Sequence, residues 1–179
     1  MAGTCAEYGL ANGEMKEDAP TEPSNFYGIA KDCLRKASEQ MFKKSEKELI
    51  WTRIFFPYGN GHRNPNSLFN VVRQAIRNKE KAIDVTQCDQ IRDFIKVEDV
   101  AKHLIAIAEA AVAEKIINIG SGKPKTIRDF LEDYIASQNS KLKLNLGAIP
   151  KRLDEPQAFW ANIDRLNRTI RTKHGESTQ

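Results

Sequence analysis

The most informative segment of the sequence is Pro23-Ser24-Asn25-Phe26-Tyr27-Gly28-Ile29-Ala30-Lys31-Asp32-Cys33-Leu34-Arg35-Lys36. Pro23 and Ser24 provide a stop signal and a helix cap, and the apolar residues that follow recur at three-to-four spacing. This pattern predicts one long helix that ends near Lys44. Tyr27 and Lys31 share a face of it, and an ammonium group beside a phenol favours the ionised phenol, so the pair suits proton exchange. The same spacing also fits a solvated lysine beside a half-buried tyrosine.

Four further segments accompany this helix in a fixed order. They are Ala2-Gly3-Thr4-Cys5-Ala6-Glu7-Tyr8-Gly9, Arg53-Ile54-Phe55-Phe56-Pro57-Tyr58-Gly59, Ile91-Arg92-Asp93-Phe94-Ile95-Lys96-Val97-Glu98-Asp99-Val100-Ala101 and Ile117-Asn118-Ile119-Gly120-Ser121-Gly122. Together with the Tyr27 helix, this series resembles the extended short-chain dehydrogenase/reductases, specifically the NAD-dependent epimerase/dehydratase family that acts on nucleotide sugars. The resemblance runs from about Ala2 to about Leu166.

The resemblance implies an α/β fold, with a truncated Rossmann-like, doubly wound sheet and a small α/β substrate-binding lobe. Residues 1–60 would be the C-terminal remnant of the dinucleotide-binding domain, formed by a strand, the Tyr27 helix and another strand. Residues 61–164 would be mainly the substrate-binding lobe, and residues 165–179 a basic, disordered tail. The family fold begins with a βαβαβ unit whose first turn binds the cofactor pyrophosphate, and no counterpart of it precedes Met1.

The resemblance also assigns roles to individual residues. The family's proton-transfer group would be Thr4, Tyr27 and Lys31, of which Tyr27 and Lys31 would also contact the NAD or NADP ribose. Five residues would bind the nucleotide-sugar substrate: Arg92, Tyr58, Asn60, Leu68 and Val85. Arg92 matches the arginine that pairs with the substrate diphosphate, a task suited to a planar fork of donors. Without the motifs, Thr4 could equally be a turn-capping hydroxyl, and Arg92 a surface residue beside Asp93.

Three positions depart from the family pattern. Phe56 stands where relatives commonly carry an asparagine that contacts the nucleotide sugar, and Cys88 stands where many have glycine. Cys5-Ala6 follow Thr4 where sugar dehydratases carry an Asp-Glu pair. Dehydration is therefore disfavoured, whereas epimerisation and keto-reduction stay open. Asp93 and Asp99 are expected to hold turns and helix starts rather than substrate.

Hydrophobic patterning predicts the remaining elements. The interval 9–22 is predicted as a loop, strands are expected within 47–56, 82–86, 91–95, 116–119 and 142–146, and helices within 66–79, 97–113, 126–137 and 159–170. The segment Gly120-Ser121-Gly122-Lys123-Pro124-Lys125 lacks the third glycine of a dinucleotide fingerprint and the Lys-Ser/Thr of a P-loop. We therefore interpret it as a tight turn.

The amino-acid composition disfavours several classes of binding partner. The 179 residues include 28 Lys and Arg against 24 Asp and Glu, mostly interleaved, which disfavours nucleic-acid binding. Three dispersed cysteines indicate neither a disulfide framework nor a metal site, and reduced thiols suit a cytoplasmic protein. No apolar window reaches the length of a membrane span, which is about 18 residues or more.

The sequence leaves two hypotheses. The first is part of an NAD(P)-dependent nucleotide-sugar epimerase or ketoreductase, which on its own is expected to bind no cofactor. It would act as a homo-oligomer or with a complementary N-terminal chain. The alternative is a non-catalytic remnant that binds a nucleotide sugar or self-associates.

Overall fold

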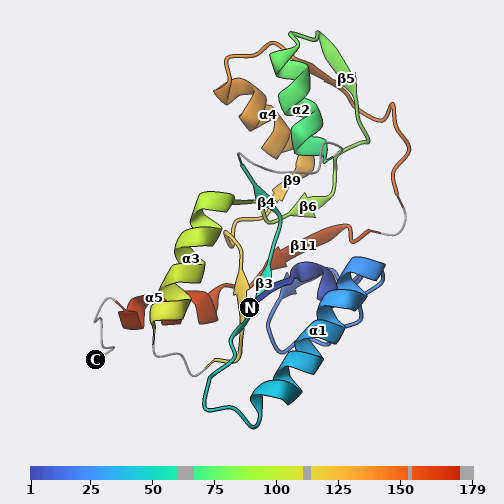
Figure 1. Ribbon diagram of the computed structural model, residues 1–179. Helices are drawn as coiled ribbons and strands as arrows, with labels where there is room; N and C mark the ends of the chain where they lie inside the picture. Colours follow the sequence, from blue (N-terminus) through green and yellow to red (C-terminus); the bar gives the residue numbers. More distant parts are fainter. Residues whose placement is uncertain (60–66, 111–113, 153–154, 174–179) are drawn as a thin grey trace.

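The structure is a computed structural model that describes residues 1–59, 67–110, 114–152 and 155–173 (Figure 1). In chain order its elements are β1 (Ala2–Thr4), the 3-10 helix η1 (Cys5–Tyr8), β2 (Gly13–Met15), α1 (Phe26–Phe42), β3 (Trp51–Ile54), β4 (Pro57–Tyr58), α2 (Leu68–Arg77), β5 (Ala82–Asp84), β6 (Ile91–Arg92), β7 (Ile95–Lys96), α3 (Val97–Glu109), β8 (Ile116–Ile119), β9 (Lys125–Thr126), α4 (Ile127–Ser137), β10 (Lys143–Asn145), β11 (Ala158–Ala161) and α5 (Asp164–Lys173).

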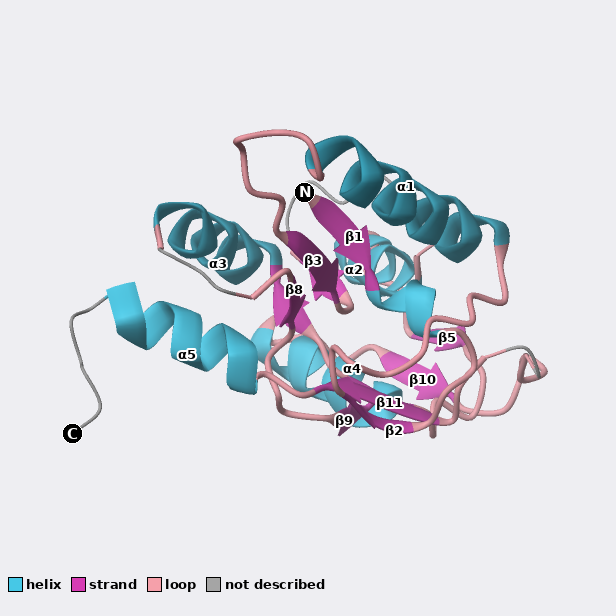
Figure 2. Cartoon of the chain, turned by 90° about the horizontal axis from the view of Figure 1, so that it is seen from below, coloured by secondary structure: helices cyan, strands magenta, loops and turns pink. Residues whose placement is uncertain are grey.

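A parallel sheet in the order β1-β3-β8 is the centre of the lower part of the molecule. Helix α1 lies at the β1 side, and α3 and α5 lie together at the β8 side (Figures 1 and 2). The apolar core there includes Ile117 and Ile119 of β8, with Leu166 of α5. The predicted α/β class is confirmed, and β1 is an edge strand of this sheet.

Helix α1 presents its polar face to the protein. Its cap is Asn25, one residue later than predicted, and the Asn25 side chain accepts a hydrogen bond from Gly28 N–H over 2.9 Å. Gly28, Asp32, Arg35 and Ser38 are its buried residues, whereas Phe26 is 92% exposed and Met41 is 76% exposed. The apolar periodicity identified the helix correctly, but the apolar side faces outward.

A second sheet, in the order β2-β11-β6-β9, lies between the two parts of the molecule (Figure 1). Two sequence predictions are wrong here. The interval 9–22 contains strand β2 as well as loop, and the expected helix at 159–170 begins with strand β11 before α5 starts. Both strands pair with partners distant in sequence, because β11 pairs with β2 and with β6. The hydrophobic pattern within a segment does not reveal a strand partner that is distant in sequence.

The upper lobe consists of α2 and α4 with the parallel pair β5-β10 (Figure 1). Thr126 caps α4 as predicted, because its side chain accepts from Asp129 N–H over 3.0 Å. The lobe has its own core, which includes Val72, Leu131 and Leu142. The division of the chain near residue 60 stays a prediction.

Helix α5 corrects the expectation of a disordered tail. Residues 165–173 lie in this helix, and Leu166 and Thr169 are buried. Arg165, which was counted as part of a basic tail, pairs with Asp18 over 2.6 Å and lies 3.5 Å from a Glu114 carboxylate oxygen. The part of the prediction that concerns residues 174–179 lies outside the described residues.

Within the described ranges, no helix is long and apolar enough to cross a bilayer. The same residues contain no group of three or more His, Cys, Asp or Glu side chains that could hold a metal ion.

Candidate active site

Thr4 lies where β1 ends and the chain turns into η1. Its backbone N–H donates to Glu7 Oε1 over 3.0 Å, and its hydroxyl oxygen accepts from Ala6 N–H over 3.3 Å. The two bonds form a capping box around the start of η1. Thr4 therefore caps this turn with its side chain.

Tyr27 and Lys31 lie on adjacent turns of α1. Tyr27 is 59% exposed, and the Lys31 ammonium lies 6.0 Å from the centre of the Tyr27 ring. Lys31 Nζ donates to the backbone oxygen of Ala2 in β1 over 3.0 Å. The structure thus brings the two side chains together, whereas the predicted pairing of the ammonium with the phenol oxygen stays a prediction.

A buried charge network holds α1 against the sheet. Glu7 is fully buried and accepts from Trp51 Nε1 over 3.0 Å and from Arg53 Nε over 3.0 Å. Arg35 of α1 approaches the same carboxylate at 3.7 Å. At the start of α1, a side chain at Gly28 would come within 2.6 Å of Ala6 O. This close approach places the turn that carries Tyr27 directly over η1, next to Thr4.

Arg92 lines a cavity of about 310 Å³ between the sheets and the upper lobe. The residue is 4% exposed; its Nη1 donates to the backbone oxygen of Ile91 over 2.8 Å, and Nη2 lies 3.6 Å from a Glu155 carboxylate oxygen. Burial lowers the pKa of the guanidinium, and Glu155 counteracts this effect. A buried cation at the wall of a cavity of this size is suited to an anionic ligand.

The rest of the cavity wall is mostly apolar and aromatic. It is formed by Phe56, Pro57, Tyr58, Ser67, Leu68, Phe69, Phe94, Ile127, Phe130, Leu131 and Glu155. Three of the residues predicted to bind the substrate, Arg92, Tyr58 and Leu68, thus line one cavity, whereas substrate binding itself stays a prediction. The structure corrects Val85, because this residue is 1% exposed inside the lobe core and is not part of the wall. Asn60 lies outside the described residues.

Glu155 is a site residue that the sequence reasoning missed. It reaches the cavity and Arg92 from a segment 63 residues further along the chain. A single acidic residue before a proline carries no pattern that would mark it.

The turn at Gly120-Ser121-Gly122 cannot cradle a phosphate, because its amide groups already have an acceptor. Asp93 accepts from Ser121 N–H over 2.7 Å, from Gly122 N–H over 3.1 Å and from Ala161 N–H over 3.2 Å. Asp93 thus holds a turn, and Asp99 lies in the first turn of α3, as predicted for both. Contacts of Tyr27 and Lys31 with the ribose of a nicotinamide dinucleotide stay a prediction.

Cys5 follows Thr4 and is also buried. Burial raises the pKa of the Cys5 thiol to about 12, although the charge of Arg92 opposes the shift. The thiol is therefore neutral near pH 7, and it cannot act as the acid-base pair of a dehydratase.

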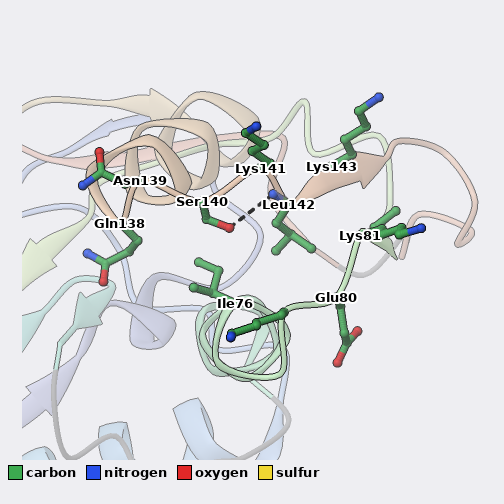
Figure 3. A pocket seen from close by; sticks show the side chains of 11 residues that line it. Ile76, Glu80, Lys81, Gln138, Asn139, Ser140, Lys141, Leu142 and Lys143 are labelled. Carbon is green, nitrogen blue, oxygen red and sulfur yellow. Dashed lines mark hydrogen bonds between the residues drawn. The ribbon is translucent and has the colours of Figure 1, made fainter.

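A second hollow, of about 600 Å³, lies at the far end of the upper lobe (Figure 3). Lysines surround it, but Figure 3 shows that Lys81, Lys141 and Lys143 point outward rather than toward a common point. A hollow without converging polar groups is a weak candidate for a ligand site.

Residues 1–120 match the model of the NAD dependent epimerase/dehydratase family. The chain belongs to this family. It is 31% identical over 163 residues to dTDP-6-deoxy-L-talose 4-dehydrogenase (NAD(+)) of Aggregatibacter actinomycetemcomitans, covering 89% of this chain and 59% of that protein. It is 26% identical over 136 residues to dTDP-4-dehydro-6-deoxyglucose reductase of Escherichia coli, covering 75% and 43% respectively.

The fold is also that of solved epimerases. UDP-N-acetylglucosamine 4-epimerase from Methanobrevibacter ruminantium M1, in complex with UDP-N-acetylmuramic acid, superposes with a TM-score of 0.82 at 24% identity. That match covers 94% of this chain and 55% of the epimerase. This member of the epimerase/dehydratase family thus spans between 43% and 59% of the length of these three proteins.

Proposed function

We propose that this chain provides the substrate-binding and proton-transferring part of an NAD(P)-dependent nucleotide-sugar epimerase or ketoreductase. The observation that carries the proposal is the arrangement of two groups of residues. Thr4, Tyr27 and Lys31 lie on β1 and α1, and the apolar cluster that contains Cys5, next to Thr4, packs against Phe56, which lines the Arg92 cavity. This contact supports a substrate position that extends from the Arg92 cavity toward the proton-transfer group.

In this proposal each residue of the site has a defined role. Arg92 pairs with the diphosphate of the substrate, and the apolar wall of the cavity covers the nucleoside. Tyr27 exchanges a proton with the hydroxyl oxygen at the reacting sugar carbon, and Thr4 donates a hydrogen bond to the same oxygen. Lys31 favours the ionised phenol and contacts the cofactor ribose. Bound NAD(P) supplies the hydride chemistry.

The relatives support oxidation or reduction at C4 of the sugar. One is named a 4-dehydrogenase, another reduces a 4-dehydro sugar, and a structural neighbour is a 4-epimerase. The neutral thiol of Cys5 disfavours dehydration, so epimerisation and keto-reduction are the two reactions proposed.

We further propose that the chain by itself does not retain NAD(H), because Tyr27 and Lys31 offer only a ribose contact. Its partner would be a second copy or a chain with the cofactor-binding half. The alternative function is a non-catalytic remnant that binds a nucleotide sugar or self-associates, and the exposed apolar side of α1 favours it.

Calorimetric titration with dTDP and UDP tests the substrate-binding part. We expect at least one nucleotide to bind, and Arg92→Ala to weaken its affinity about tenfold or more through loss of a charge-assisted contact. Lys141→Ala, which removes a cation at the distant hollow, should leave the affinity unchanged. No binding of either nucleotide at millimolar concentration, or equal affinity in Arg92→Ala, would contradict the proposal.

A further inference from the structure

An apolar wall lies between Thr4 and Arg92, and Phe56 is its main component. Phe56 follows the end of β3, and its ring centre lies 5.4 Å from the guanidinium carbon of Arg92. Its ring packs edge-on against Phe159, with the ring centres 6.3 Å apart. Phe56 packs against the apolar cluster that contains Cys5, the residue after Thr4. Phe56 thus contacts both the Arg92 guanidinium and the cluster that contains Cys5, the residue after Thr4.

The sugar of a bound substrate would have to lie along this wall. In a nucleotide sugar the diphosphate is attached to C1, and the proposed reaction takes place at C4, on the opposite side of the ring. With the diphosphate at Arg92 and C4 at Thr4 and Tyr27, one of the two ring edges faces Phe56. One edge is C2–C3, which carries two hydroxyl groups, and the other is C5–O5 with the exocyclic C6, which carries one; below, this second edge is called the C5–C6 edge.

The chemistry of the wall favours the C5–C6 edge without its hydroxyl. A phenyl ring offers no hydrogen bond, and a neutral thiol is only a weak donor. A hydroxyl pressed against this surface loses water without a replacement partner, whereas a methyl group gains from being removed from water.

We propose that Phe56 makes this site selective for nucleotide-linked 6-deoxyhexoses over the corresponding hexoses. The selection occurs through a methyl group at C6 that packs on the Phe56 ring. This inference rests on the proposed function and adds the class of sugar.

The test compares sugars that differ by one oxygen atom. The full chain is titrated with dTDP-glucose and dTDP-6-deoxyglucose, with the matching UDP pair, and with dTDP and UDP alone. We expect the 6-deoxy sugar to bind about tenfold more tightly, which corresponds to about 1.4 kcal/mol.

Two substitutions assign the preference to Phe56. Phe56→Asn provides an amide that can satisfy the C6 hydroxyl, and it should reduce the preference to about threefold or less. Phe56→Leu keeps the wall apolar and should retain most of the preference. Phe69→Leu is the matched control, because Phe69 lies on α2 beside Tyr58, with their ring centres 5.5 Å apart, and should affect both sugars alike. Circular dichroism establishes that each variant is folded.

The outcomes separate this inference from the proposed function. Failure of every nucleotide and nucleotide sugar to bind overturns both. Equal affinity for the two sugars, or for the sugars and the bare nucleotide, overturns the 6-deoxy selectivity and leaves nucleotide-sugar binding intact. A preference that survives Phe56→Asn unchanged overturns the role of Phe56.

Discussion

At the scale of single residues, Asp32 shows how charge holds the helix that carries Tyr27. Asp32 is buried and pairs with Lys36 over 2.7 Å and with Arg35 over 2.8 Å. Burial alone would raise the pKa of Asp32, but the hydrogen bonds from Lys36 and Arg35 outweigh burial and lower it. A depressed carboxyl pKa in the folded state stabilises the protein above the unfolded-state pKa, and this contribution is lost as the pH falls through the folded value.

We therefore expect Asp32→Asn to lower the free energy of unfolding by about 2 kcal/mol at pH 7, since charge-assisted bonds are lost. The difference from the unchanged chain should narrow as the pH falls below about 4, where aspartate titrates in the unfolded state. Urea unfolding at pH 7, 5 and 3 measures this difference in the free energy of unfolding. Asp133→Asn, which removes an exposed partner of Lys125, serves as the control and should cost less than about 1 kcal/mol. A difference that does not change with pH would contradict this account.

The order of the motifs identified the family, and the resemblance then assigned roles to individual residues, which stay predictions. Three of the predicted substrate-binding residues, Arg92, Tyr58 and Leu68, line one cavity. Val85 was misplaced because an apolar residue in a strand fits a ligand pocket and a core equally well. Glu155 was missed because its contact with Arg92 exists only once the chain is folded. Cys88 has a φ of 52°, the backbone region where glycine is favoured, which accounts for the glycine in many relatives.

At the level of helices and strands, hydrophobic periodicity predicted the helices and the central strands well. It failed for strands that form only because they pair with segments distant in sequence. Helix α1 was identified from its apolar residues, but which side is buried depends on Glu7 and Ala6 beneath it. Strands β2 and β11 exist because they pair with each other across more than a hundred residues. A three-residue strand such as Gly13–Met15 has no period long enough to be detected.

The outward side of α1 leads to a prediction about self-association. Leu34 and Met41 are 45% and 76% exposed, and Phe26 adds a nearly bare ring at the start of the helix. A second copy could cover this surface, and β1 could contribute because it is an edge strand. We expect light scattering at tens of micromolar, a rough range for weak contacts, to report a dimer or larger species.

Substitutions on α1 test whether its outward side forms the contact between two copies of the chain. The double variant Leu34→Glu with Met41→Glu should shift the population toward monomer, because each carboxylate would lose water in the contact. Ile105→Glu on α3, where the residue is 57% exposed, provides the matched control and should leave the oligomer intact. A monomeric unchanged chain, or an equal effect of the α3 variant, would speak against α1 as the contact.

At the level of the whole molecule, the described residues include the proposed proton-transfer group and the Arg92 cavity, and we find no loop among them that suits a pyrophosphate. Thr4 lies on β1, and Tyr27 and Lys31 lie on α1, which packs on β1 and on η1, so the described residues alone hold this arrangement. What such a half would add is the position of the nicotinamide relative to the sugar. A separate chain could position the nicotinamide if its sheet pairs along β1, which is an edge strand.

We therefore expect nucleotide-sugar oxidoreduction to appear when the cofactor-binding half of a relative is added in trans. Tyr27→Phe should lower turnover by about 10²–10⁴-fold, because it removes the exchangeable proton with little change in shape. Tyr134→Phe, a tyrosine of the upper lobe that packs against Phe69, should leave turnover unchanged. The assay follows NAD(P)H absorbance with a nucleotide sugar as substrate.

If the mixture turns over equally well with Tyr27→Phe, α1 is not the catalytic element. If no turnover appears while dTDP or UDP still binds, the non-catalytic remnant becomes the better account of the chain, since substrate affinity would then survive without proton transfer.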